Sequence, residues 1–185
     1  MARGNLKARD LALLDQVDAF KRTPFAQNVW RVAREGRDPV MGSPSDSRWS
    51  NGAYDVLYTS LARDGALAEI HTFLALQPVF PSKIRFNLYE LSVKASKTLR
   101  LADLETLARL GVDVARYEER EYARTQAISD AACFLGFDGL VVPSARWSCL
   151  NAVLFTDRLM PDDIEITASE PEMVDWAAWR KGARK

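Results

Sequence analysis

A polar loop that leads through a short strand into a helix carrying a glutamate constrains this chain most. Residues 48–71 read RWSNGAYDVLYTSLARDGALAEIH, and the β-branched and aromatic content of 56–59 predicts the strand. Asp64 is placed to cap the helix that follows. The apolar stripe of that helix is Leu67, Ile70 and Leu74. Glu69 would then be held at a fixed point beside the strand, either as an acid for chemistry or as the partner of an arginine.

Length and composition predict one globular domain. The chain has 185 residues, enough for a sizeable core and too few for two domains to be expected. Its 25 Lys and Arg balance its 25 Asp and Glu, so electrostatics give no reason to expect direct nucleic-acid binding, although both tails are basic. No apolar window has the length of a membrane span and no leader pattern is present, so we expect a cytoplasmic protein without membrane contact.

The cysteine and histidine content excludes several kinds of catalytic centre. Cys133 and Cys149 follow no metal-ligand spacing, and we expect both thiols to be reduced. His71 is the only histidine, so a zinc site of three histidines is impossible and any histidine relay would have to use this residue. We therefore expect no metal, and we expect His71 to be a helix-surface or core residue.

Helical and extended patterns mix irregularly along the rest of the chain. Strands and helices show no regular βαβ alternation, which favours an α+β fold over a doubly wound sheet. Neither GxGxxG nor GxxxxGK[ST] occurs, which weighs against a Rossmann or P-loop nucleotide site. A change of parity within 83–93 predicts a β-bulge near Leu88 and Tyr89. Helices are predicted over 6–20, 103–110, 120–135 and 173–179, and strands over 28–33, 83–93, 139–142, 151–155 and 164–167.

Six polar residues are candidates for a binding or catalytic site, since each lies at a strand end, in a loop or on an adjoining helix. Arg31, within the strand 28–33, is either a buried ion-pair partner or an anion receptor. The irregular segment 34–52 that ends near Arg48 is either a binding loop or a linker. Two arginines, an aromatic ring, a carboxylate and a hydroxyl suit a ligand that contains pyrophosphate. The six residues are Arg31, Arg48, Tyr58, Glu69, Ser144 and Asn151.

Several stretches around these six residues, taken in chain order, resemble the RES-domain family, which is named for an arginine, a glutamate and a serine. They extend from about residue 29 to residue 155, so the resemblance covers most of the chain. Two departures are that Ser50 follows Trp49 where the family usually has asparagine, and that Thr156 follows Phe155 where it tends to have Asn-Pro. The matching stretches are Trp30-Arg31-Val32, Arg48-Trp49 with Gly52, VLYTS at 56–60, LAEI at 67–70, and VPSA at 142–145 followed by Asn151 and Leu154.

The resemblance implies a single RES domain over residues 1–185, with a core at about 26–168 and basic extensions at both ends. It implies a split, curved antiparallel sheet with surrounding helices, similar to that of ADP-ribosyltransferase toxins. The implied function is that of a toxin in a bacterial toxin–antitoxin pair, which attacks NAD+ by hydrolysis, phosphorolysis or ADP-ribosyl transfer to a protein. The implied partner is an antitoxin with a helix-turn-helix DNA-binding region whose other end covers the active site.

Cleavage of the ribose–nicotinamide bond fits the chemistry of these residues. The bond breaks through a cation-like sugar, so a single fixed carboxylate, Glu69, would stabilise the charge and hold a ribose hydroxyl. Nicotinamide leaves as a neutral amide, so no strong general acid is needed. We predict Glu69 and Arg31 as the catalytic residues, with Arg31 clamping the pyrophosphate. The predicted substrate-binding residues are Arg48, Tyr58, Ser144 and Asn151. Tyr58 would stack against the nicotinamide, Ser144 would hydrogen-bond the ribose, and Arg48 would hold either the pyrophosphate or an attacking phosphate.

Three alternatives remain open on the sequence alone. Leu67 occupies the position where arginine-directed transferases have a second acid or amide, which argues against arginine as the acceptor but does not separate water, phosphate and another side chain. A non-catalytic interaction module would keep the arginines and Glu69 as structural groups and use Trp176 and Trp179 for binding. A nuclease toxin is disfavoured by the neutral charge balance and the single histidine.

Overall fold

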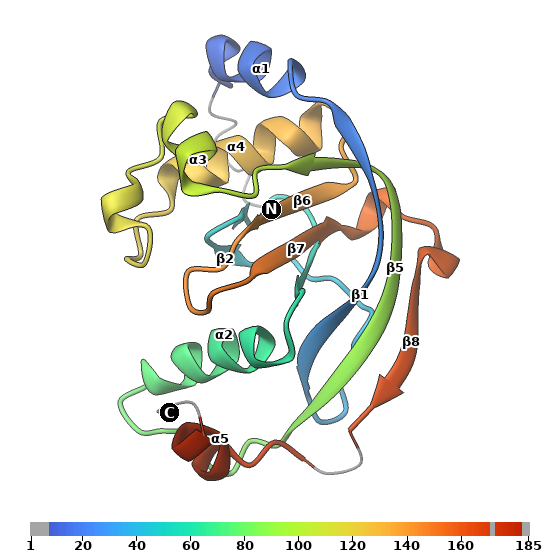
Figure 1. The fold of residues 1–185 in the computed structure, drawn as a ribbon, viewed down its shortest axis with the longest axis vertical. Coiled ribbons are helices and arrows are strands. Elements are labelled where there is room, and N and C mark those ends of the chain that lie inside the picture. Colours follow the sequence, from blue (N-terminus) through green and yellow to red (C-terminus); the bar gives the residue numbers. More distant parts are fainter. Residues whose placement is uncertain (1–7, 171–172, 183–185) are drawn as a thin grey trace, which may run out of the picture.

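The computed structural model describes residues 8–170 and 173–182 (Figure 1). The helices are α1 (Leu11–Asp18), α2 (Arg63–Ala75), α3 (Leu104–Arg109), α4 (Ala123–Phe134) and α5 (Trp176–Gly182), with short 3-10 turns η1 (Val114–Arg116), η2 (Thr156–Arg158) and η3 (Pro161–Asp163). The strands are β1 (Arg22–Arg34), β2 (Asp46–Ser47), β3 (Ser50–Asn51), β4 (Val56–Ser60), β5 (Phe86–Arg100), β6 (Gly139–Pro143), β7 (Leu150–Phe155) and β8 (Ile164–Ser169).

The main sheet curves until its first strand meets its fifth. Its order is β1-β4-β7-β6-β5-β8, and β1 also pairs with β5 over almost its whole length, while β2 and β3 form a separate ribbon. In Figure 1 the long strands β1 and β5 rise along one side, and the shorter β6 and β7 cross beside them. The closure of β1 on β4 rests on the single residue pair Trp30 and Ser60. The predicted α+β domain with a split sheet is confirmed.

One pair of strands departs from the antiparallel pattern that the family resemblance implies. β5 and β6 run parallel over Thr98–Arg100 and Gly139–Val141, whereas their other pairings are antiparallel. The chain between them passes through α3, η1 and α4 before it returns. A parallel pair requires a long crossover of this kind, so these helices cover the sheet on the way back.

The bulge predicted near Leu88 and Tyr89 is wrong. The register of β1 against β5 is unbroken from Phe25 to Arg34, and the irregularity opposite β8 falls between Glu90 and Leu91. The parity change has another cause, because Leu88 packs into a core cluster with α2 and α5 while Leu91 packs into the cluster enclosed by the curved sheet. β5 therefore buries one face at its start and the opposite face further along.

Element boundaries follow the sequence patterns with local differences. The helix predicted over 6–20 begins at Leu11, and its first two residues lie outside the described part of the chain, as do the outermost residues of both basic tails. Asp103 caps α3 as predicted and accepts a hydrogen bond from Thr106 N at 2.7 Å. Asp64 does not cap α2, because the cap position is Ala62. Asp64 lies in the first turn, where its charge complements the helix dipole.

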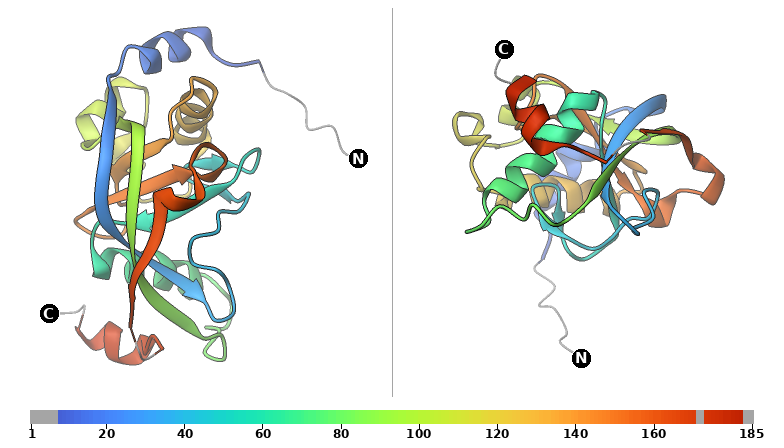
Figure 2. Two further views of the ribbon diagram at one scale, coloured as in Figure 1. Left: turned by 90° about the vertical axis from the view of Figure 1, so that its right-hand side faces the viewer. Right: turned by 90° about the horizontal axis from the view of Figure 1, so that it is seen from below.

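The helices pack on the sheet in two groups, one near each end of it. α1, α3 and α4 cover one end of the sheet, and α2 and α5 lie together near the other end (Figures 1 and 2). None of the helices in residues 8–170 and 173–182 combines the length and the apolar run needed to cross a bilayer. The site described next lies where α2 approaches β1 and β4.

Candidate active site

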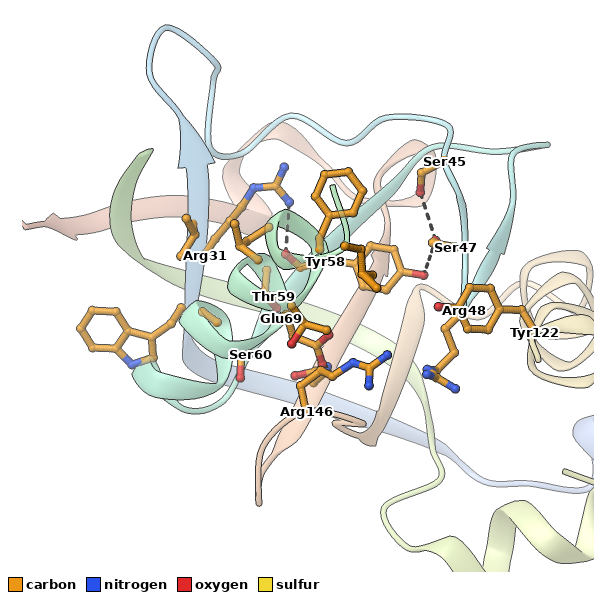
Figure 3. Close-up of a pocket in the computed structure, with 18 of the residues that line it drawn as sticks. Arg31, Ser45, Ser47, Arg48, Tyr58, Thr59, Ser60, Glu69, Tyr122 and Arg146 are labelled. Carbon is orange, nitrogen blue, oxygen red and sulfur yellow. Dashed lines mark hydrogen bonds between the residues drawn. The ribbon is translucent and has the colours of Figure 1, made fainter. Parts of the chain in front are cut away.

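A cavity of about 290 Å³ brings the predicted site residues together (Figure 3). Its walls come from β1, from the segment around β2, from β4 and from α2, and further residues come from the loops before α4 and after β6. Five of the six predicted residues line it: Arg31, Arg48, Tyr58, Glu69 and Asn151. The sixth, Ser144, is hydrogen-bonded to Glu69. Residues up to 120 positions apart in sequence therefore meet in a single site.

Glu69 is held by two donors from two different strand ends. Its Oε1 accepts the Ser144 hydroxyl at 2.7 Å and the Asn151 side-chain amide at 2.9 Å. Both bonds end on Oε1, so Oε2 takes part in neither. No ion pair among the described residues involves Glu69. Within that part of the chain, the alternative of a glutamate that only neutralises an arginine is excluded, and the carboxylate is fixed in place with its charge uncompensated by a salt bridge.

Gly65 sets how closely the helix that carries Glu69 approaches the sheet. A Cβ atom added at Gly65 would lie 2.5 Å from Cys149 Sγ and nearer still to Ser60 Oγ. The two side chains are also in contact with each other, at 3.3 Å between Ser60 Oγ and Cys149 Sγ. Only glycine permits this approach, which brings Glu69, one turn further along α2, within hydrogen-bonding reach of Ser144 and Asn151.

Arg31 is a half-buried cation that has no carboxylate partner within residues 8–170 and 173–182. Its guanidinium donates to the backbone carbonyl oxygens of Tyr58 at 3.1 Å and Met41 at 3.5 Å, and its buried Nε has no partner among the described residues. Burial lowers the pKa of Arg31 to about 10, against a smaller raising effect of the Asp38 charge. The group is still charged at pH 7. The ion-pair alternative is excluded among the described residues, and the geometry favours an anion receptor.

Arg48 lies at the opposite end of the cavity from Arg31 (Figure 3), and its guanidinium contacts two aromatic rings. Its guanidinium lies 4.7 Å from the ring centroid of Tyr117 and 4.9 Å from that of Tyr122. It donates to the carbonyl oxygen of Glu119 at 3.1 Å, while its buried Nη1 lacks a partner among the described residues. The two cation–π contacts hold the guanidinium plane in place at the cavity wall.

Tyr58 is fixed through its hydroxyl group. The Tyr58 oxygen lies 2.7 Å from Ser47 Oγ and accepts the backbone N–H of Trp49 at 2.8 Å. Burial raises the pKa of Tyr58 well above its ordinary value, against smaller lowering effects of these two hydrogen bonds. The phenol is therefore neutral at pH 7, and its ring forms a rigid part of the cavity wall.

Two further arginines, neither of them among the six predicted residues, also line the cavity. Arg120 precedes α4 within the charged run YEERE, which looks like an ordinary solvated segment. Arg146 lies two residues after Ser144, and its side chain has no hydrogen bond or ion pair within residues 8–170 and 173–182. Four arginines and one glutamate thus line the cavity, which makes it strongly cationic. Proximity to Ser144 was a signal that could have identified Arg146, whereas nothing in the sequence distinguishes Arg120.

His71 and Cys149 lie outside the cavity wall. His71 is on α2 but packs against Phe80, Trp176 and Trp179, so the prediction of a helix-surface or core histidine is confirmed. Cys149 is half-buried and packs beside Ser60, and burial raises the pKa of its thiol. Neither residue provides a nucleophile or a base to the site.

The chain is thus a mixed-sheet domain with an arginine-lined pocket around a single anchored carboxylate. The family model described as RES domain matches residues 28–177. The chain therefore belongs to the RES domain family, and the resemblance seen in the sequence is confirmed.

A comparison with solved structures shows the same fold in another protein. A similar solved structure is a chain of the "Crystal structure of the M.tuberculosis MbcT-MbcA toxin-antitoxin complex", with a TM-score of 0.83, 18% sequence identity, and coverage of 96% of this chain and 100% of that chain. At that identity the likeness shows the fold. A search of curated proteins gives no significant match.

Proposed function

We propose that the protein is the toxin of a toxin–antitoxin pair and that it breaks the nicotinamide–ribose bond of NAD+. The observation that carries the proposal is the carboxylate of Glu69, fixed by Ser144 and Asn151 in a cavity lined by four arginines. The reaction develops positive charge on the ribose, which a fixed carboxylate stabilises. The diphosphate of the substrate carries negative charge, which buried guanidinium groups recognise.

The size of the cavity suggests that only part of the NAD+ molecule lies inside it and that the rest extends toward the solvent. A volume of about 290 Å³ is at the lower end of ligand pockets. It suits the nicotinamide, its ribose and the adjoining phosphate, with the adenosine half toward the solvent. Tyr58 would provide the ring that stacks on nicotinamide, and Arg31 and Arg48 would bind the phosphates from opposite ends.

The hydrogen bonds refine the role that we assign to Ser144. Its hydroxyl donates a hydrogen bond to Glu69. Its oxygen accepts hydrogen bonds from the backbone N–H groups of Arg146 and Trp147 at 3.1 and 3.2 Å. We therefore propose that Ser144 acts first by orienting Glu69, and that a ribose hydroxyl competes for the same groups when substrate binds. Asn151 shares this orienting role.

Glu69→Gln tests the proposed reaction, because it keeps the shape of the side chain and removes its charge. We expect NAD+ cleavage by the purified protein to fall about a thousandfold, and the loss of intracellular NAD+ on expression to disappear. Glu165→Gln on the exposed face of β8 is the matched control and should retain full activity. Unchanged NAD+ loss in the Glu69→Gln variant would show that catalysis by this residue is wrong.

Analysis of the reaction products identifies the acceptor of the ADP-ribose group. Incubation with labelled NAD+ and cell lysate gives free nicotinamide without labelled protein if water or phosphate is the acceptor. A discrete labelled protein band indicates transfer to a side chain. Dependence of the rate on added phosphate then separates phosphorolysis from hydrolysis.

We propose as partner an antitoxin that carries a helix-turn-helix DNA-binding region and covers the cavity. The similar M. tuberculosis chain comes from a toxin–antitoxin complex, which supports this assignment. Phe73 and Leu76 also line the cavity and are 58% and 50% exposed, so an apolar contact is available at the mouth. Expression with the gene product encoded next to the toxin should prevent NAD+ loss, and the purified complex should show reduced NAD+ cleavage.

The packing of Trp176 and Trp179 argues against the competing hypothesis of a non-catalytic interaction module that binds through these two rings. Trp176 is only 7% exposed and belongs to the core cluster beneath α2, and Trp179 packs against the same cluster. Both residues serve to attach α5 to the rest of the fold.

A further inference from the structure

We propose that Trp179 of the C-terminal helix is a positioning residue for the active site. Through Trp147 it would hold the β6–β7 loop, and with it Ser144, in the conformation that orients Glu69. The kinetic consequences of this role rest on the proposed function, whereas the mechanical coupling does not.

An aromatic cluster first attaches α5 to the helix that carries Glu69. The ring of His71, two residues after Glu69, has its centroid 5.1 Å from that of Trp179 and 5.9 Å from that of Trp176. Phe80 closes the cluster, 5.8 Å from His71 and under the guanidinium of Arg180. Figure 2 shows α5 and α2 lying side by side, seen from below. The position of α5 is therefore tied to α2 by ring contacts.

A second contact connects α5 to the loop between β6 and β7. The rings of Trp147 and Trp179 have centroids 6.3 Å apart and are tilted by 45°. The backbone N–H of Trp147 donates to Ser144 Oγ, and the hydroxyl of Ser144 donates to Glu69. A continuous set of contacts thus leads from Trp179 through Trp147 and Ser144 to Glu69.

The loop needs such support because its own anchors are few. Residues 144–149 are half-buried or exposed and contain no regular secondary structure. Their backbone–backbone hydrogen bonds are local, from Ser144 N to Cys149 O and from Cys149 N to Trp147 O, and the N–H groups of Arg146 and Trp147 donate within the loop to Ser144 Oγ. A tilted aromatic pair provides an attraction that changes a local equilibrium several-fold. Without the ring of Trp179, we expect the loop to leave its catalytic conformation for part of the time.

Hydrogen exchange tests the mechanical coupling without any assumption about the reaction. In Trp179→Ala we expect the amides of Arg146 and Trp147 to exchange three- to tenfold faster than in the wild type. Trp179→Phe keeps an aromatic ring and should restore most of the protection. Lys181→Ala, on an exposed position of the same helix, is the matched control. Exchange in residues 144–149 that is equal in Trp179→Ala and Lys181→Ala would overturn the proposal.

Kinetics of NAD+ cleavage test the functional consequence. Trp179→Ala should lower kcat about three- to tenfold and change KM less than about twofold, because Arg31 and Arg48 bind from other elements. Trp147→Ala removes the other ring and leaves α5 intact. In that background, a further Trp179→Ala change should have little effect on kcat. Independent, multiplicative effects would contradict a shared route through Trp147.

The two measurements separate failure of the inference from failure of the proposed function. If Glu69→Gln and the wild type cleave NAD+ equally, the proposed function is wrong, and hydrogen exchange alone decides on the coupling. If Glu69→Gln is inactive while Trp179→Ala has wild-type kcat and wild-type exchange, the function stands and the positioning role is wrong. Thermal melting of each variant accompanies both measurements, so that kcat refers to folded protein.

Discussion

Arg31 shows at the scale of one residue how a cation can be held without an acid. Among the described residues its half-buried guanidinium bonds only to backbone carbonyl groups, and burial lowers its pKa. Replacing an imperfectly compensated buried charge with an apolar side chain is often neutral or stabilising. Under the proposed function, a bound phosphate would compensate the charge of Arg31.

Arg31→Met should therefore separate stability from binding. We expect the free energy of unfolding to rise by about 1 kcal/mol, while KM for NAD+ rises about tenfold or more because a charge-assisted contact is lost. Denaturant unfolding and steady-state kinetics provide the two values. Arg34→Met, on an exposed position of the same strand, is the control. A destabilised variant with wild-type KM would mean that Arg31 is structural.

The element that matters most for the site is α2, because its first turn lies against β4 and the β6–β7 loop. Alanine is normally favoured over glycine inside a helix by about 1 kcal/mol. At Gly65 that gain is opposed by contacts with Ser60 and Cys149, which would both have to move. Overpacking typically costs about 1–3 kcal/mol, so the steric effect should be the larger.

Gly65→Ala should lower both stability and activity. We expect a loss of about 1–2 kcal/mol in unfolding free energy and a fall of about tenfold in kcat, because α2 and Glu69 are displaced from their donors. The same change in a Ser60→Ala, Cys149→Ala background should be far milder, since the obstructing atoms are gone. Gly182→Ala, where an added Cβ meets nothing, is the control. Equal effects in both backgrounds would show that close approach is not the cause.

The docking of α5 on α2 makes the protein sensitive to acid. Burial, and to a smaller extent the charge of Arg180, lowers the pKa of His71 below its ordinary value. The unfolded chain therefore binds a proton more readily than the folded one, so stability is greatest above the ordinary pKa of about 6.5 and falls as the pH drops through it.

His71→Phe should remove this dependence. We expect the fall in stability between pH 7 and pH 5 to be shallower in the variant, by less than about 1.4 kcal/mol per pH unit, which is the limit for one proton. Urea midpoints measured across that range provide the comparison, with Lys181→Ala as the reference. An identical slope in wild type and variant would exclude His71 as the source.

At the scale of the whole molecule, Asp138 connects the start of β6 to β5, next to the parallel pairing of these two strands. Its Oδ2 accepts the backbone N–H groups of Ser96 and Lys97 at 2.9 and 2.8 Å, and the Ser96 hydroxyl at 3.1 Å. The residue is 8% exposed and does not line the cavity. Loss of its carboxylate would leave buried N–H groups without an acceptor.

Asp138→Ala should destabilise the fold without changing the chemistry. We expect a loss of about 2–3 kcal/mol in unfolding free energy and a wild-type kcat for the folded fraction. Chemical unfolding and kinetics below the transition midpoint measure both. Asp162→Ala, on an exposed acid, is the control. A reduced kcat at wild-type stability would place Asp138 in the catalytic machinery and contradict its structural role.

Much of this molecule could be predicted from local pattern. The strand and helix around Tyr58 and Glu69, the cap at Asp103 and the short final strands all appear where periodicity and turn residues indicate them. The parity of β5 was misread as a bulge, because a strand that buries opposite faces against two different clusters has no local signature. Arg120 was missed for a related reason, since its neighbours in sequence are solvated acids.

The elements and the chemical groups of the site can be predicted from sequence, because capping, periodicity and residue type act over a few neighbouring positions. The sequence also placed the chain in its family. The fold brings these groups together in ways that local sequence does not specify. Ser144 and Asn151 share one oxygen of Glu69, Arg31 has no acid partner among the described residues, and an aromatic contact links α5 to the β6–β7 loop. These relations join residues far apart in the chain. They depend on the curvature of the sheet and the close approach of α2, which no short stretch of sequence specifies.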